Sequence, residues 1–326
     1  MDSRGTATIA APLHPLAKGS VLVYPTDGPA HLSDMDDAMV SALHASLRDV
    51  VDSWRLDGRA AAYMVIGVDD LLGGQSFRYQ AVPYPRAVTD LENAWRQFRV
   101  IRRLVFGMNR AFRATLTRNP ASAAQLARLH PVRHAGSSSD PSRCPFCRRD
   151  VLQSQIVMEG RTVVALYNFA PIGLRGDKLH FLIIPKAHRP GFEDLTREEH
   201  REAFELARRV VHRLSAHFGQ GAMKRLYTYH KTGPEAGQSV PHWHLHLVLF
   251  RSHLHDIWAR SQVLLKILAP PSLASRLSRS ELAAKQAEYS RILSSSDRRE
   301  GCHGTVPLAN NSVLRERFHT ASASQD

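Results

Sequence analysis

Residues 233–250 read Gly-Pro-Glu-Ala-Gly-Gln-Ser-Val-Pro-His-Trp-His-Leu-His-Leu-Val-Leu-Phe, with histidines at the alternate positions 242, 244 and 246. Alternation that continues into an apolar tail predicts a β-strand, on which residues i, i+2 and i+4 share one face. We therefore expect His242, His244 and His246 in one row, roughly 6–7 Å apart. Backbone amides of the preceding turn, Gly237 to Ser239, could hold an anion. Surface histidines on an edge strand are the alternative, and the Gly-Gln-Ser turn argues against it.

Composition narrows the class of protein. The chain has 326 residues, 43% of them apolar, and a formal net charge of +13. This length suits one large domain or two ordinary ones, and the charge favours nucleotides, phosphorylated small molecules or nucleic acid as partners. We find no secretory signal and no run of about 18 apolar residues, so we expect a cytoplasmic protein without a membrane partner.

The order of predicted elements occurs twice along the chain. Each set is a strand, a helix and two strands, at 20–24, 33–54, 61–68 and 77–84 in the first and at 181–185, 196–218, 226–230 and 242–250 in the second. This repetition predicts an internal duplication. Chance similarity of two strand–helix–strand units is the alternative.

An alignment of the two sets indicates which one keeps the histidines. Gln75 and Gln238 lie 163 positions apart, as do Leu32 and Leu195, whereas Pro25 and Pro185 lie 160 apart. The second copy is therefore expected to carry three additional residues between its strand and its helix. In this alignment the histidines correspond to residues without their chemistry, namely Tyr79, Ala81 and Pro83. The second half is then the active one.

The chain is expected to divide into segments of different character. These are a flexible start at 1–17, a degenerate half at 18–85, a basic helical connector at 86–140, the active domain at 141–255, a helical extension at 256–294 and a disordered tail at 295–326. Within 86–133, many arginines face only Asp90 and Glu92, with apolar residues interleaved at helical spacing. This pattern fits the solvated face of a packing helix, and a nucleic-acid surface is the alternative.

Cys144-Pro-Phe-Cys147 predicts a metal site. Two thiolates at this spacing form half of a tetrahedral zinc site, whereas a redox role lacks a thioredoxin-like strand before the motif. The remaining ligands would have to be histidines, and His188, which follows a strand, and His242 are the candidates. The four residues would form a closed, structural Zn²⁺ site.

Asn168 closes a predicted strand at 162–167, in Leu-Tyr-Asn-Phe-Ala-Pro. Its side chain could bind a ribose hydroxyl, or it could be a turn residue.

These motifs, in this order, resemble the histidine triad (HIT) superfamily. The resemblance covers about 140–250 and rests on Cys-x-x-Cys, Leu-Ile-Ile-Pro-Lys-x-His and Gly-Gln-Ser-Val-x-His-x-His-x-His. It implies an α+β fold in which helices pack on one face of an antiparallel sheet. The duplication and the Cys-x-x-Cys are similar to the galactose-1-phosphate uridylyltransferase-like branch, in which one chain holds two related halves as an internal pseudo-dimer. The chain would then be a monomer of this kind or a homodimer.

The chain departs from that branch at several positions. The third triad position is His246 instead of Gln, the active half is the second instead of the first, Asn168 replaces an acidic ribose-binding residue, and Leu179-His180 replaces Gly-His. These differences bear on the substrate.

The resemblance implies an enzyme that transfers or hydrolyses nucleotidyl groups through a covalent phosphohistidine. His244 would attack the α-phosphorus of a nucleoside monophosphate linked to a leaving group, while His246, Gln238 and Ser239 would hold the phosphate oxygens. Asn168 and the turn from Gly237 to Ser239 would bind the nucleotide. Removal of nucleotide adducts from nucleic-acid ends, through the basic segment, and a non-catalytic nucleotide-binding or interaction module are the alternatives.

Overall fold

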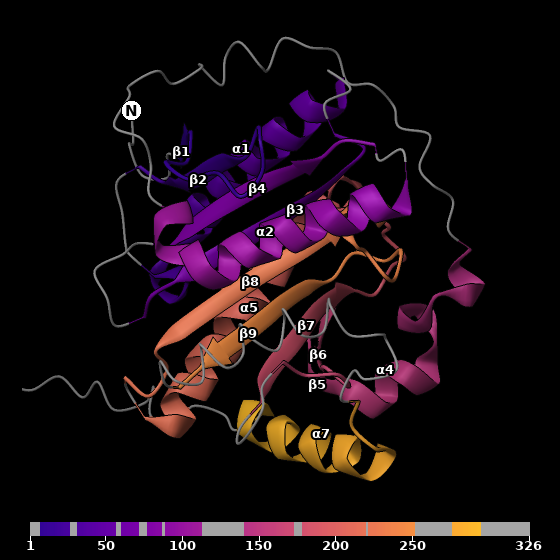
Figure 1. The fold of residues 1–326 in the computed structure, drawn as a ribbon. Coiled ribbons are helices and arrows are strands. Elements are labelled where there is room, and N and C mark those ends of the chain that lie inside the picture. Colours follow the sequence, from indigo (N-terminus) through magenta and orange to yellow (C-terminus); the bar gives the residue numbers. More distant parts are fainter. Residues whose placement is uncertain are drawn as a thin grey trace, which may run out of the picture. The chain divides into compact units, whose positions relative to one another are not determined.

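The computed structural model describes residues 7–26, 31–56, 60–71, 77–86, 89–112, 140–172, 178–219, 221–251 and 276–294. Within them the chain is an α+β fold built on one nine-stranded antiparallel sheet of order β1-β2-β4-β3-β8-β9-β7-β6-β5 (Figure 1). The strands are β1 Ala7–Ala10, β2 Val21–Pro25, β3 Ala62–Asp69, β4 Arg78–Tyr84, β5 Ile156–Glu159, β6 Val163–Tyr167, β7 Leu179–Pro185, β8 Arg225–Thr232 and β9 Leu245–Phe250. The α-helices are α1 Asp37–Leu56, α2 Asp90–Ala111, α4 Arg149–Gln155, α5 Arg197–Phe218 and α7 Arg279–Ser294. No described helix is both long enough and apolar enough to cross a bilayer.

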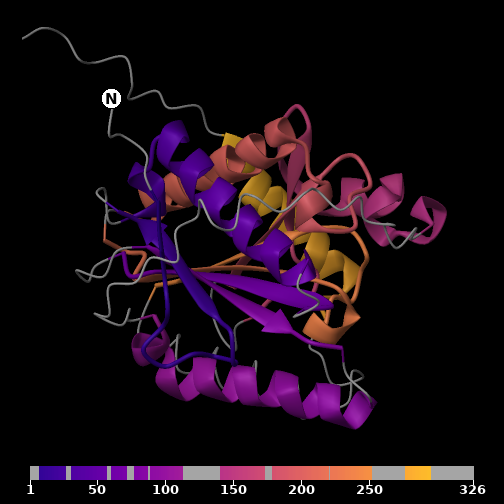
Figure 2. The same cartoon turned by 90° about the horizontal axis from the view of Figure 1, so that it is seen from above.

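Helices cover both faces of the sheet. Strand alternation sends Leu245, Leu247 and Leu249 of β9 into a core with α1, α5 and α7, and sends Val248 and Phe250 into a core with α2. Figure 2 shows α2 on the opposite side of the sheet from α1 and α5. Helices α1 and α5, which belong to the repeated units, lie on one face of the sheet as expected. The connector helix α2 covers the other face.

The same strand pairing builds both halves of the sheet. Leu22 pairs with Gln80, which pairs with Ile66, as Leu182 pairs with His246, which pairs with Tyr229. Strands β2, β4 and β3 therefore correspond to β7, β9 and β8, and the internal duplication is confirmed. At the junction Ile66 pairs with its own counterpart Tyr229, so a pseudo-twofold axis passes between β3 and β8.

The expected position of the three additional residues is wrong. The 3₁₀-helix η1 (Leu32–Asp34) corresponds to η4 (Phe192–Asp194), 160 positions later, so the counterpart of Leu32 is Phe192 and not Leu195. The helix starts keep this offset, because Asp36 accepts a hydrogen bond from the Met39 amide as Thr196 does from the Glu199 amide. The extra residues are therefore inserted between the helix start and β8. A shift of three positions along a helix still aligns apolar residues with apolar residues, so the sequence alignment did not detect it.

The expected counterparts of the histidines are also wrong. The pairing makes Gln80 the counterpart of His246 and Arg78 the counterpart of His244, in place of Tyr79, Ala81 and Pro83. Gly74, Gln75 and Ser76, on which the sequence alignment relied, lie outside the described residues.

Arg78 and Gln80 hold the end of α2. The Arg78 guanidinium donates to the Phe112 carbonyl at 2.9 Å, and the Gln80 amide donates to the Ala111 carbonyl at 3.2 Å. The last carbonyls of a helix lack intrahelical partners and carry partial negative charge, so a cation and a donor stabilise this end. In the first half, these positions therefore anchor the connector.

Some elements were not expected. Strand β1, at residues 7–10, lies in the segment predicted to be a flexible start, and it pairs with β2. Strand β5 and the short helix α4 were not anticipated either. Helix α7 lies in the predicted extension and packs through Tyr289, whose ring stacks on Tyr167 at 5.0 Å. Residues 252–275 and the predicted tail at 295–326 lie outside the described residues.

Gly67 on β3 is expected to be intolerant of a side chain. A Cβ at this position would lie 2.3 Å from Thr228 Oγ1 and 2.8 Å from Phe77 Cζ, so Gly67→Ala must displace core groups at the junction of the halves. Overpacking of this kind costs about 1–3 kcal/mol. We expect that loss in the free energy of unfolding from urea titration. Adding Thr228→Ala, which removes the nearest atom, should restore part of it, and wild-type stability in Gly67→Ala alone would contradict the packing described.

Candidate active site and metal centre

The predicted metal ligands converge at one point. Cys144 precedes the 3₁₀-turn η3 (Pro145–Cys147) and Cys147 ends it, while His188 follows β7 and His242 precedes β9. Their ligand atoms all lie within 4.8 Å of one another. Cys144 Sγ lies 3.4 Å from His242 Nδ1, and Cys147 Sγ lies 3.3 Å from His188 Nδ1 and 3.6 Å from His242 Nδ1. The cluster could bind a metal ion.

Hydrogen bonding prepares His242 as a ligand. Its Nε2 donates to the Pro185 carbonyl at 3.0 Å, which leaves the Nδ1 lone pair directed at the thiols. Burial lowers the pKa of His242 to about 4, so the ring is neutral. Burial and the neighbouring Cys144 raise the pKa of Cys147 to about 11. Two thiols this close resist ionisation unless a cation joins them.

The row of histidines is divided between a loop and a strand. Strand β9 begins at Leu245, so only His246 lies in it, and His242 and His244 belong to the extended segment before it. The expected single row on one strand is therefore wrong. The Trp243 amide donates to the Arg189 carbonyl, which holds this segment against the loop that carries His188.

His244 is a buried, neutral imidazole with a fixed tautomer. Its Nδ1 donates to the His242 carbonyl at 2.7 Å, so Nε2 keeps its lone pair. Burial lowers the pKa of His244, and the charge of Lys231 lowers it further. Phe146, between the two cysteines, contacts the His244 ring with centroids 5.3 Å apart. The turn that carries the two cysteines thus packs against the His244 ring.

His246 is held by a second histidine that the sequence analysis did not select. The Ile172 amide donates to His180 Nδ1 at 3.0 Å, so His180 Nε2 carries the proton and donates to His246 Nδ1 at 2.9 Å. His246 Nε2 then carries a proton and can donate to an anion. Its ring stacks on Tyr229 at 4.1 Å, and burial lowers the pKa of His246 well below its usual range.

Asn168 lies beside this pair. Its amide nitrogen lies beside the His180 ring, 3.1 Å from Nε2 and 3.2 Å from Nδ1, and its Oδ1 accepts a hydrogen bond from the Ala170 amide. The side chain is buried, and both of its polar ends contact protein groups. The turn interpretation therefore describes these contacts, and a contact with ribose stays a prediction.

The Gly-Gln-Ser loop is braced by its own glutamine. Gln238 Oε1 accepts from the Gly233 amide and its Nε2 donates to the Pro190 carbonyl, both at 2.8 Å. Gly237 has a positive φ of 78°, which a glycine adopts without strain, and Ser239 is exposed. The side chain of Gln238 is thus engaged in shaping the loop.

Lys231 is a cation at this site that no sequence motif indicates. A Cβ on Gly237 would lie 3.3 Å from Lys231 Nζ, so the ammonium group lies directly beside the loop. Its charge contributes to the lowered pKa values of both His244 and His246, and burial lowers the pKa of Lys231 itself. The site therefore combines a neutral histidine whose Nε2 keeps its lone pair, an imidazole donor and a cation.

Comparison with known proteins shows what this chain is similar to. Residues 149–253 match the HIT domain family model. Over 99 residues the chain is 33% identical to a bis(5'-adenosyl)-triphosphatase of Dictyostelium discoideum, a match that covers 30% of this chain and 61% of that protein. A solved uridylyltransferase has a TM-score of 0.50 at 14% identity, covering 88% of this chain and 85% of its own. A mutant uridylyltransferase gives the same TM-score and covers 88% of both chains.

The chain spans less than two thirds of the curated relative, and the solved structures support the fold alone. Residues 149–253 are thus similar to the HIT domain, and the duplicated sheet as a whole has a fold similar to that of a solved uridylyltransferase.

Proposed function

We propose that the protein is a nucleotide hydrolase or nucleotidyltransferase that works through a covalent nucleotidyl-histidine at His244. The observation that carries this proposal is the hydrogen bond from His244 Nδ1 to the His242 carbonyl, which leaves Nε2 of a buried, neutral ring with its lone pair. The substrate would be a nucleoside monophosphate joined to a leaving group by a phosphoanhydride, phosphoester or phosphoramidate bond. Relatives named as a triphosphatase and a uridylyltransferase support this class.

The reaction would proceed in two displacements at phosphorus. His244 Nε2 attacks the α-phosphorus, the N–P bond forms, and the leaving group departs with the electron pair of its bond. Water or a second phosphorylated substrate then attacks phosphorus, and the N–P bond breaks to restore the lone pair of His244. His246 Nε2–H, Lys231 and the Ser239 amide would stabilise the charge that develops on the phosphate oxygens. The Gly237 and Gln238 amides instead donate to the Pro234 and Gly233 carbonyls and shape the loop.

We infer that the Cys₂His₂ cluster is a structural Zn²⁺ site. A tetrahedral zinc ion with Zn–S of about 2.3 Å and Zn–N of about 2.05 Å separates sulfur from nitrogen by about 3.5 Å. The measured Sγ–Nδ1 distances of 3.3, 3.4 and 3.6 Å fit this value. Four protein ligands leave no open position for a substrate, which supports a structural role. Zinc would join the turn that carries Phe146 to the segment that carries His244.

His244→Ala should abolish covalent labelling. We would incubate the protein with a panel of α-³²P-labelled dinucleoside polyphosphates and nucleoside phosphoramidates and score acid-labile, alkali-stable label on protein. Loss of the nucleophile should lower turnover about a thousandfold or more and remove the label. His212→Ala, an exposed histidine on α5, is the matched control.

A His244→Ala protein that still hydrolyses the panel at the wild-type rate would disprove the covalent route. Nucleotide that binds the wild-type protein and is never cleaved would favour the non-catalytic alternative.

His180→Phe tests whether His180 positions His246. Loss of the 2.9 Å hydrogen bond frees the His246 ring, so we expect kcat to fall about 10- to 100-fold with little change in KM. Label on His244 should still form, more slowly. His180→Gln keeps a side-chain donor and should recover part of the rate, whereas equal losses in both variants would point to packing alone.

Removal of the metal should destabilise the protein. Metal analysis should find one zinc per chain, and the Cys144→Ser/Cys147→Ser variant should lose it and unfold at a Tm lower by more than about 5 °C. Cys302→Ser is the control, because Cys302 is the remaining cysteine of the chain and lies outside the Cys-x-x-Cys motif. Full zinc content in the double serine variant would show that the ligands lie elsewhere.

A further inference from the structure

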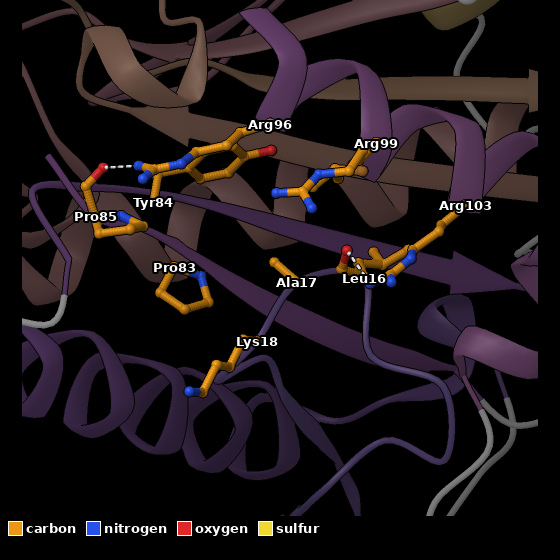
Figure 3. Close-up of a pocket in the computed structure, with 10 residues that line it drawn as sticks. Leu16, Ala17, Lys18, Pro83, Tyr84, Pro85, Arg96, Arg99 and Arg103 are labelled. Atoms are coloured by element: carbon orange, nitrogen blue, oxygen red, sulfur yellow. Dashed lines mark hydrogen bonds between the residues drawn. The ribbon is translucent and has the colours of Figure 1, made fainter. Parts of the chain in front are cut away.

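A second concave site lies away from the histidines. A cavity of about 310 Å³ opens between α2, the end of β4 and the segment before β2 (Figure 3). Its cationic side chains are Lys18, Arg96, Arg99 and Arg103, and its apolar lining includes Leu16, Pro83, Tyr84 and Val100. None of these residues belongs to the HIT site. Arginines at spacing i, i+3 and i+7 lie on one side of a helix, which explains why α2 directs all three here.

Two of the arginines are fixed in place by backbone carbonyls. Arg103 donates to the Pro15 carbonyl at 2.8 Å and to the Leu16 carbonyl at 3.0 Å. Arg96 donates to the Pro85 carbonyl at 2.9 Å and also pairs with Glu92. Carbonyl contacts orient a guanidinium without neutralising it, so the charge of Arg103 persists.

The remaining two cations are exposed at the cavity. Arg99 extends from α2, and Lys18 lies across the opening from it (Figure 3). Among the described residues, no ion pair joins Lys18, Arg99 or Arg103 to a carboxylate, and Glu92 pairs with Arg96. The cavity thus has a net positive charge and two flexible donors for an incoming anion.

The chemistry of the cavity selects its ligand. An apolar floor favours a flat or hydrophobic group, and a rim of arginine and lysine favours a phosphate, which arginine binds through paired donors. The volume lies at the lower end of small-molecule sites. We propose that this cavity is a second phosphate-binding site that takes a nucleotide unit, either free or within a single strand of nucleic acid.

The surroundings of the cavity would let a single strand of nucleic acid extend beyond it. Tyr84 is separated from Thr232 by strand β3, because Ala62 pairs with Tyr84 and Tyr63 with Thr232. Two strand spacings, about 10 Å, therefore separate the cavity from the end of β8, after which the chain continues into the Gly-Gln-Ser loop. On the outer face of α2, Trp95 and Phe98 are stacked at 5.4 Å, and Trp95 is 58% exposed. Exposed aromatic rings beside arginines are platforms on which bases of a single strand stack. A free nucleotide would fill the cavity without contacting Trp95 and Phe98.

Calorimetric titration of the full chain tests the proposal. The probes are adenosine monophosphate and a 5'-phosphorylated ten-nucleotide oligothymidylate, at low and moderate salt. Arg99→Gln should weaken one class of sites for these probes about tenfold, since it removes one charge-assisted contact. Arg102→Gln, an exposed arginine on the same helix outside the cavity lining, should stay within twofold of wild type.

The two sources of the phosphate separate in the same experiment. If the ligand is a strand, the oligonucleotide binds at least tenfold tighter than the monophosphate, Trp95→Ala weakens only the oligonucleotide, and Arg99→Gln lowers the log–log salt slope by about 0.7. If it is a free nucleotide, the two probes bind alike and Trp95→Ala has no effect. Binding of both probes that neither Arg99→Gln nor Lys18→Gln changes would overturn the proposal. Labelling of His244 is scored separately, so either proposal can fail alone.

Discussion

The antiparallel pairing of β3 with β8 is the interaction on which the rest of this structure depends. It runs from Tyr63 opposite Thr232 to Asp69 opposite Leu226 and joins two half-sheets into one. Each half alone would expose a strand edge with unpaired amides and carbonyls. The close packing of Gly67 against Thr228 shows how little space the junction leaves. Once this pairing has formed, α2 can span both halves. Gln97 on α2 donates to the Glu235 carbonyl, just before the Gly-Gln-Ser loop.

The two halves use equivalent positions for different purposes. On the α2 face of the sheet, polar side chains must find partners because buried donors and acceptors without them are costly. In the first half, Arg78 and Gln80 meet the carbonyls that end α2. In the second half, His246 meets His180, and His244 meets a backbone carbonyl of its own loop, which leaves one nitrogen of each ring for other chemistry. The first half therefore has a helix anchor at the positions where the second half has His244 and His246.

Local sequence was sufficient for the parts of the site that short motifs encode. The four residues that cluster in the structure were predicted from three motifs, namely the Cys-x-x-Cys spacing, a histidine after an apolar strand and the Gly-Gln-Ser turn before His242. Each of these motifs fixes its own backbone geometry. The helices α1 and α5 could likewise be predicted from their apolar periodicity. Contacts that arise from strand register could not be predicted from the sequence. His180 and Lys231 lie on strands whose pairing only the folded sheet determines. The counterparts Arg78 and Gln80 were misassigned because the alignment relied on the repeated Gly-Gln-Ser, whereas strand register makes Gln80 the counterpart of His246.

The pseudo-twofold axis between Ile66 and Tyr229 also changes how the protein responds to dilution. Where two separate subunits meet across such an axis, the assembled fraction depends on protein concentration. Here both partners belong to one polypeptide, so the junction closes in a unimolecular step governed by the tether between them. The two halves can also diverge, because a substitution in one half leaves the other half unchanged. In a homodimer the same substitution would occur in both subunits. A single connector helix could thus be added to one side without having to fit the other.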